Sequence, residues 1–154
     1  IYAGFDKVLP FVDHLIASSE FPGRWTGLED PFEALKKIQS DFGMKVAAMT
    51  LGAHGALALV EGRFVYSPGF VVNCLDTTGA GDVFHGAYCY AVLAGMPIDE
   101  ALTFSNALAA LNCTAMGARG GLNRLLSPGR AARRPAISAI GIATTGSRRS
   151  MPTC

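Results

Sequence analysis

Short apolar runs separated by glycine, proline and charged residues characterise the first half of the chain and predict strands. The runs occupy residues 13–18, 45–51, 56–60 and 63–67. Glu61-Gly62, between the last two runs, is typical of the turn in a hairpin. The segment 19–29 follows the first predicted strand and shows no sustained period, so we expect it to be a loop. The pattern therefore predicts four strands.

Three other stretches have the apolar spacing of helices. In residues 30–43 an Asp-Pro start precedes apolar residues at helical spacing, and a glycine follows. Residues 79–94 form a second predicted helix that Gly95 and Pro97 stop. A third runs from about Asp99 to Met116, is apolar around most of its circumference and ends at Gly117. Strands followed by two buried helices indicate an α/β fold, with a layered sheet flanked by helices.

The apolar periodicity stops after Leu122, so we divide the chain into a folded region, 1–122, and a tail, 123–154. Seven arginines and no acidic residue follow Glu100, whereas all 12 acidic residues and only six basic ones lie at or before it. Because no aromatic residue is interleaved with the basic ones, we interpret 123–154 as a disordered, solvated tail and expect no nucleic-acid partner.

Cysteine and histidine spacing points to neither a disulfide framework nor a structural metal. The four cysteines form no C-x-x-C pair and the three histidines have no zinc-ligand spacing, which favours a reducing, cytoplasmic location. The sequence shows no secretory leader and no apolar run suited to a bilayer, so we expect no membrane partner. It opens at Ile1 without methionine, which suggests a fragment.

Candidate chemistry lies in Asp76-Thr77-Thr78-Gly79-Ala80-Gly81-Asp82, directly before a predicted buried helix. Small residues allow backbone N–H groups to approach an anion, and the first turn of a helix adds unpaired amides and partial positive charge. A carboxylate at Asp82 is then placed to accept a proton from a hydroxyl that attacks a bound phosphoryl group. The alternative interpretation is a purely structural turn. A dinucleotide site is excluded, because the G-x-G-x-x-G spacing is absent.

The segment 76–87 resembles the C-terminal signature of the PfkB (ribokinase-like) carbohydrate kinase family. In addition, 50–55 resembles the family's T-x-G-x-x-G turn, and 112–122 resembles the loop after its last buried helix. The three motifs occur in family order. The resemblance covers residues 1–122 and implies a partial ribokinase-like layered sheet that lacks the N-terminal half and the lid.

Residue roles follow from this resemblance position by position. It implies that Asp82 is the catalytic base and that Gly79, Ala80 and Gly81 form the anion hole for the transferred phosphate. It also places Thr50, Gly52 and Gly55 beside the nucleotide phosphates, and Asn106 on the helix that flanks the adenine. Asp76 and Thr78 match positions whose backbone carbonyls help to hold a monovalent cation, such as K⁺. Mg²⁺ is expected to accompany ATP.

The implied activity is ATP-dependent phosphotransfer to a sugar hydroxyl. Ribose, fructose, a keto-deoxy sugar acid and a nucleoside stay open as substrates, because the family's N-terminal half supplies the sugar pocket. We expect this chain alone to have little activity. The alternative is a catalytically silent nucleotide-binding or interaction module that self-associates through exposed apolar surface. His85 is interpreted as a packed or surface residue rather than a proton shuttle, and Cys89 and Cys113 as small core residues.

Overall fold

The structure, a computed structural model, describes residues 4–122 and contains one mixed sheet. Its strands are β1 (His14–Ser18), β2 (Val46–Thr50), β3 (Ala56–Val60) and β4 (Arg63–Ser67). They lie in the order β1-β2-β3-β4, with β1 parallel to β2 and the other neighbours antiparallel. All four predicted strands and the hairpin are confirmed.

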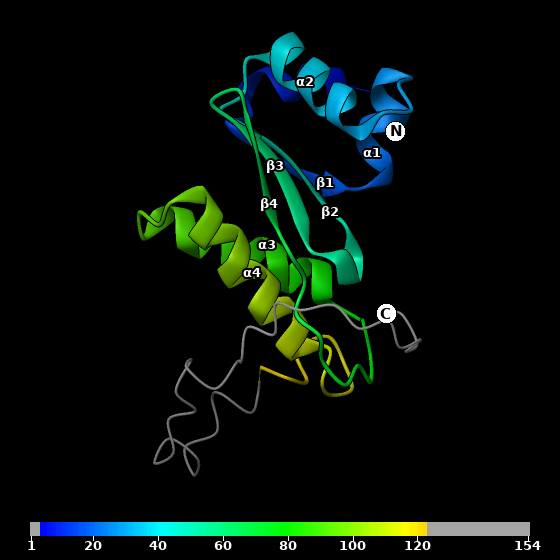
Figure 1. The fold of residues 1–154 in the computed structure, drawn as a ribbon, viewed down its shortest axis with the longest axis vertical. Helices are drawn as coiled ribbons and strands as arrows, with labels where there is room; N and C mark the ends of the chain where they lie inside the picture. The colour runs from blue at the N-terminus through cyan, green and yellow to red at the C-terminus, as the bar shows by residue number, and fades with distance from the viewer. Residues whose placement is uncertain (1–3, 123–154) are drawn as a thin grey trace.

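Helices cover both faces of this sheet (Figure 1). The α-helices are α1 (Glu20–Thr26), α2 (Pro31–Phe42), α3 (Ala80–Leu93) and α4 (Ile98–Asn112). Three short 3₁₀ turns, η1 (Phe5–Lys7), η2 (Leu9–Phe11) and η3 (Gly52–His54), complete the described elements. Figure 1 shows α1 and α2 on one side of the strands and α3 and α4 on the other, so the predicted layered α/β fold is confirmed.

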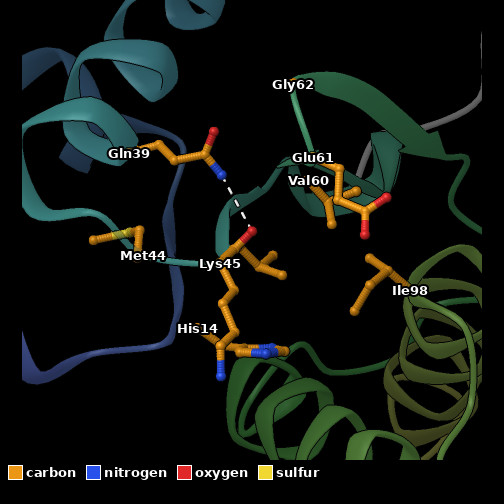
Figure 2. Close-up of a pocket in the computed structure, with 9 residues that line it drawn as sticks. His14, Gln39, Met44, Lys45, Val60, Glu61, Gly62 and Ile98 are labelled. Atoms are coloured by element: carbon orange, nitrogen blue, oxygen red, sulfur yellow. Dashed lines mark hydrogen bonds between the residues drawn. The ribbon is translucent and has the colours of Figure 1, made fainter.

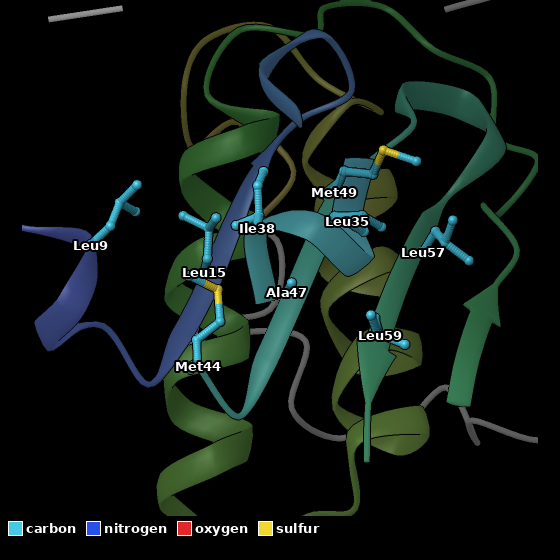
Figure 3. Packing of buried hydrophobic residues seen from close by; sticks show 9 residues of the cluster. All are labelled: Leu9, Leu15, Leu35, Ile38, Met44, Ala47, Met49, Leu57 and Leu59. Carbon is cyan, nitrogen blue, oxygen red and sulfur yellow. The ribbon is translucent and has the colours of Figure 1, made fainter. Parts of the chain in front are cut away.

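Side chains of the central strands alternate between two apolar clusters. Ala47 and Met49 face the cluster that contains Leu35 and Ile38 of α2 (Figure 3), whereas Val46 and Ala48 face α3 and α4. This follows from the period of two in a strand. On the α3 and α4 side the central strands present one valine and three alanines (Val46, Ala48, Ala56, Ala58), which share an apolar cluster with buried residues of both helices.

The predicted start of α2 is confirmed in detail. Asp30 Oδ1 accepts hydrogen bonds from the backbone N–H groups of Phe32, at 2.8 Å, and Glu33, at 3.5 Å. These two groups are among the first-turn donors that have no partner within a helix. Pro31 occupies the first helical position, where the missing N–H is harmless, and Gly43 ends the helix with a φ of 68°.

The prediction of a loop over 19–29 is wrong, because residues 20–26 form α1. Pro22 and Gly23 suggest a loop in the sequence, but Pro22 lies in the first turn, where no helical hydrogen bond requires its N–H. Tertiary contacts favour the helix: Phe21 and Trp25, one turn apart, stack at 5.9 Å, and both rings contact Phe5.

The last helix ends earlier than predicted, at Asn112 instead of Met116. The carbonyl of Cys113 accepts hydrogen bonds from the N–H groups of Leu75, at 2.8 Å, and Asp76, at 3.3 Å. The segment before α3 thus binds the carbonyl oxygen of Cys113, which in a longer helix would accept a bond from within the helix, and the helix ends here.

Three further expectations concern the whole chain. Cys89 and Cys113 are free thiols, but Cys74 is disulfide-bonded, so the expectation of no disulfide is wrong at that residue. No helix within residues 4–122 is long and apolar enough to cross a bilayer. The predicted tail, 123–154, lies outside the described residues.

Candidate functional site

The predicted nucleotide residues meet at the carboxyl ends of β1 and β2. A cavity of about 360 Å³ lies there, between the η3 turn, the segment that follows β4, the start of α3 and the middle of α4. Thr50, Gly52, Gly55, Ala80, Gly81 and Asn106 are all among its lining residues. The carboxyl edge of parallel strands is where ligands bind in open α/β sheets. Three motifs that are distant in sequence therefore contribute to one cavity.

The first of these motifs depends on a close backbone approach. Gly55 has a φ of 99°, and a Cβ at this position would lie 2.1 Å from the carbonyl oxygen of Ser67. A Cβ on Gly69 would likewise lie 2.1 Å from the carbonyl oxygen of Ala53. The η3 turn can therefore lie against the segment after β4 only because both residues are glycines. This contact forms one wall of the cavity.

The start of α3 provides amides at the cavity. Gly79 caps the helix with a φ of 75°, and a Cβ there would lie 2.5 Å from the carbonyl oxygen of Ala118. The N–H of Ala80 donates to Thr77 O at 3.1 Å and is therefore already paired within the protein. The N–H of Gly81 has no partner within residues 4–122, and Gly81 lines the cavity. Of the three predicted anion-hole residues, Gly81 is the one that both lines the cavity and has an unpaired N–H group.

Asp82 lies in the first turn of α3, and its side chain is exposed. It follows Gly81 directly, at the helix end whose amides are unpaired. Its carboxylate makes no ion pair or side-chain hydrogen bond with any other described residue. The group is therefore free to meet a hydroxyl from solvent or substrate.

Asp76 ties the turn before α3 to the loop after α4. Oδ1 accepts from the N–H of Thr78 at 2.9 Å, and Oδ2 accepts from the N–H of Gly117 at 2.8 Å. These bonds, first that from Gly117 and then those from Thr78, hold the pKa of the Asp76 carboxyl below its ordinary value. The turn that carries the two predicted cation positions, Asp76 and Thr78, and the loop after α4 are thus adjacent.

Asn112, which sequence reasoning did not assign, lies beside that pair of loops. Its Nδ2 donates to Thr78 O at 3.1 Å, and its Oδ1 is buried without a hydrogen-bond partner. A buried oxygen without a donor fits a cation that prefers oxygen ligands, such as K⁺. By contrast, no group of three or more His, Cys, Asp or Glu residues suited to a metal occurs in the part of the chain that the structure describes.

Asn106 is buried in the middle of α4, with 6% of its surface exposed. Its Nδ2 donates to Ser67 O at 3.0 Å and Ser67 Oγ at 2.9 Å, with a longer contact of 3.4 Å to Pro68 O. The predicted adenine-side residue therefore also attaches α4 to the end of β4.

Several cavity residues carry no signal in the sequence. The wall includes residues from the segment between β4 and the phosphate turn (Phe70, Val71, Val72, Cys74). The segment has neither the period of a strand nor that of a helix. The sequence feature that comes nearest to indicating its position is the pair of glycines, Gly55 and Gly69, where two backbone segments lie in contact. Only the folded chain reveals that these residues form a site.

The other candidate groups have structural roles. The ring nitrogens of His85 lie 2.7 Å from Gly81 O and 3.2 Å from Ile16 O, so this side chain connects the start of α3 to β1. Burial, together with the nearby Asp76 carboxylate, raises the pKa of the Cys113 thiol. A raised pKa reduces the thiolate fraction, which agrees with the interpretation of Cys113 as a core residue. Cys89 is exposed, so its interpretation as a core residue is wrong.

A second hollow, of about 470 Å³, lies at the opposite ends of β1 and β2 (Figure 2). Lys45, which lines it, pairs with Asp13 at 3.1 Å, and Gln39 Nε2 donates to the carbonyl oxygen of Lys45 at 3.2 Å. None of the predicted site residues lines this hollow. The motifs therefore identify the smaller cavity as the candidate site.

Comparisons with known proteins agree with this arrangement. The chain is 33% identical over 121 residues to a ribokinase of Haemophilus influenzae, covering 76% of this chain and 40% of that protein. It is 32% identical over 113 residues to a 2-dehydro-3-deoxygalactonokinase of Haloferax volcanii, covering 73% of this chain and 36% of that one. The chain thus spans about two fifths of the length of these relatives.

Solved structures share the fold. A Vibrio cholerae O395 fructokinase with fructose, ADP and calcium ion bound matches with a TM-score of 0.68 and 30% identity, covering 78% of this chain and 41% of that one. A putative ribokinase II of E. coli in complex with ATP and Mg²⁺ matches with a TM-score of 0.69 and 26% identity, covering 75% and 37%.

The family model for the pfkB family carbohydrate kinases matches residues 3–124, which include every predicted site residue. The motifs, the mixed sheet and the sequence relatives agree, and the chain belongs to the pfkB family of carbohydrate kinases.

Proposed function

We propose that this chain is the nucleotide-binding and catalytic part of an ATP-dependent carbohydrate kinase. The observation that supports this most directly is the cavity where the η3 turn, the start of α3 and Asn106 meet. Its wall has unpaired backbone N–H at Gly81 and apolar side chains from the segment after β4. Phosphates belong at the helix N-terminus and a base at the apolar wall.

In the proposed reaction, the hydroxyl oxygen of a sugar attacks the γ-phosphorus of ATP, and the bond from that phosphorus to the bridging oxygen of ADP breaks. The Asp82 carboxylate orients the hydroxyl and accepts its proton, and the amides at the start of α3 stabilise the charge on the transferred group. Phosphoryl transfer depends mainly on positioning and electrostatic stabilisation, and both are available at this helix end.

Two cations belong to the proposal. The backbone carbonyls of Asp76 and Thr78 would hold K⁺, and the unpartnered Asn112 Oδ1 beside Thr78 fits the same ligand. Bound there, K⁺ would add positive charge next to the anion-binding turn. Mg²⁺ would be held by the nucleotide phosphates and water, since residues 4–122 offer no carboxylate cluster for it.

The sugar substrate is not assigned, since the relatives named above phosphorylate different compounds and are about two and a half times as long as the matched region. We also propose that the chain alone transfers phosphate slowly, because an exposed carboxylate beside an open cavity does not exclude water.

Calorimetry of ATP binding, combined with phosphotransfer assays on a panel of sugars, tests this proposal. We expect Asp82→Asn to keep ATP affinity and to reduce any phosphotransfer by roughly 10² to 10⁴-fold, the usual contribution of a general base. Asp99→Asn is the matched control, because Asp99 is also an exposed acid in the first turn of a helix, whereas only Asp82 directly follows a residue that lines the cavity, Gly81. Equal activity of Asp82→Asn and wild type would contradict the assignment.

A catalytically silent nucleotide-binding module is the second candidate. It is favoured by the cavity itself, because the predicted nucleotide residues that line it all lie within residues 4–122. ATP binding without transfer to any sugar would support the module. Transfer that Asp82→Asn removes would support the kinase.

A further inference from the structure

The carbonyl oxygens of β1 point alternately toward β2 and toward the open edge of the described sheet. Asp13 O accepts from the N–H of Val46 at 3.0 Å and therefore faces β2. Ala17 O also faces β2, where it accepts from Thr50 Oγ1 at 3.5 Å. Successive carbonyls of a strand point in opposite directions within the sheet. Ile16, one residue before Ala17, therefore directs its carbonyl oxygen to the open edge of β1.

The ring of His85 binds this oxygen and connects it to the first turn of α3. Its Nε2 lies 3.2 Å from Ile16 O, and its Nδ1 lies 2.7 Å from Gly81 O. A carbonyl oxygen only accepts hydrogen bonds, so each ring nitrogen binds its partner through an N–H group, and the imidazolium form provides both. The side chain thus attaches the carbonyl of Gly81 to the edge of the sheet.

The carbonyl of Gly81 belongs to the same peptide unit as the N–H of Asp82. This unit is trans and planar, so its C=O and N–H groups point in opposite directions. Because the carbonyls of a helix point toward its C-terminal end, the Asp82 N–H points toward the phosphate turn. Like the N–H of Gly81, it has no partner within residues 4–122. A bond that holds Gly81 O therefore also fixes the direction of a free amide.

The other attachments of α3 lie on either side of this peptide unit. The turn before the helix is bonded to the loop after α4, and Tyr88, about one turn further along, is bonded to His14 on β1. Among the side chains of residues 4–122, only that of His85 is bonded to the unit that contains Gly81 O and the Asp82 N–H. Because helix ends fray, the position of this first turn depends on that bond.

From these contacts we propose that His85 is a positioning residue for the phosphoryl transfer. By attaching Gly81 O to β1, it keeps the free amides of the first turn and the carboxylate of Asp82 in place for the terminal phosphates of the nucleotide. The inference rests on the proposed function, because it takes phosphate to bind at this helix end. It extends that function to a side chain outside the cavity wall.

Calorimetry of the whole chain with ATP and with AMP tests this role. The two ligands share base, ribose and first phosphate, so the ratio of their affinities reports how well the terminal phosphates are held. Measurement at about pH 6 keeps imidazoles mostly protonated. His85→Phe keeps an aromatic ring but has no N–H donor. In this variant the advantage of ATP over AMP should fall about three- to tenfold, the effect of one lost hydrogen bond.

Two further variants separate positioning from a general loosening of α3. His85→Gln carries an amide with two N–H groups and should restore most of the wild-type ratio. Tyr88→Phe removes the other side-chain bond between α3 and β1 and should keep the wild-type ratio. Circular dichroism verifies folding. If His85→Phe does not fold, the ring resonances of His85 in wild-type NMR spectra replace it, and they should shift with ATP but not with AMP.

Three results would overturn the positioning role while leaving the proposed kinase intact. These are a wild-type ratio in His85→Phe, an equal fall in Tyr88→Phe, and a fall that His85→Gln does not reverse. Equal shifts of the His85 resonances with both ligands would overturn it as well. If the folded wild type binds neither ligand, or binds both equally, the proposed phosphate site itself is wrong, and the positioning role is wrong with it.

Discussion

At the scale of single residues, two glycines of one motif have different physical roles. Gly79 combines a φ of 75° with a potential Cβ contact of 2.5 Å to Ala118 O, so both its backbone conformation and its packing exclude a side chain. Gly81 has ordinary helical geometry, and a Cβ on it would meet no atom within 4 Å. Gly79 therefore shapes the turn, whereas Gly81 leaves space at the cavity.

This difference predicts opposite effects of alanine at the two positions. Gly79→Ala should lower the free energy of unfolding by about 1–3 kcal/mol, because it forces a strained backbone and a contact with main-chain atoms. Gly81→Ala should keep or raise stability, by up to about 1 kcal/mol, because alanine favours helices. It should nevertheless weaken ATP binding, since a methyl group would enter the phosphate end. Urea unfolding and calorimetry measure the two quantities, and equal stability of the variants would contradict the assignment.

At the scale of elements, a partly buried side-chain pair joins β1 to α3. The hydroxyl of Tyr88 on α3 lies 3.0 Å from Nδ1 of His14 on β1, and Tyr88 is 3% exposed. Burial, with a smaller contribution from Cys89, raises the pKa of Tyr88 to about 12. Helix α3, which carries Asp82, is thus attached to a strand through a phenol whose pKa the fold raises.

The raised pKa predicts a loss of stability in alkaline solution. The unfolded chain releases the phenol proton near its ordinary pKa of 10.0, whereas the folded chain retains it up to about 12. Ionisation of Tyr88 therefore does not affect the free energy of unfolding below pH 10. As the pH rises from 10 to 12, the free energy of unfolding decreases by about 2 to 3 kcal/mol in total.

Tyr88→Phe isolates this contribution. At pH 8 the variant should be less stable by about 1 kcal/mol, for the lost hydrogen bond to His14. Between pH 10 and 12 wild type should lose this advantage, because its phenol ionises there, whereas the phenylalanine of the variant has no ionisable group. Denaturant unfolding at several pH values measures the difference, and a constant difference across that range would contradict the prediction.

At the scale of the whole molecule, residues 4–122 leave apolar surface exposed. Phe11 is 85% and Leu93 is 88% exposed, and β1 has one neighbour, β2, within the described sheet. An open strand edge and exposed apolar side chains both favour contact with other polypeptides. We therefore propose that this chain self-associates when it is studied alone.

Sedimentation velocity over a range of concentrations checks this proposal. The average mass should increase with concentration, and Leu93→Glu should reduce the increase by adding charge to the exposed end of α3. Lys37→Glu is a control, because Lys37 lies on α2 on the opposite side of the sheet (Figure 1). A monomer at all concentrations would show that this surface has no such role.

Local signals were sufficient for most elements and for the phosphate turn. Asp30 and Pro31 marked the start of α2, and short apolar runs bounded by glycine, proline and charged residues marked the four strands, because caps and turn residues act on their immediate neighbours. The segment 76–82 revealed its chemistry in the same way, through small residues before a helix. Helix α1 was missed because it is stabilised by the contact of its Phe21 with Phe5, a residue that is distant in sequence.

The amino-acid sequence by itself thus determined the layered α/β class, the family and the position of Asp82 at a helix start. Only the tertiary structure decided that Asn106 donates to Ser67 at the end of β4, that Asn112 Oδ1 is left without a donor, and that the backbones at Gly55 and Gly69 lie in contact with neighbouring segments. The physical reason is that hydrogen-bond pairing of buried groups depends on which segments meet in space. Local patterns specify elements, but only the packed chain specifies which polar atoms stay free for a ligand.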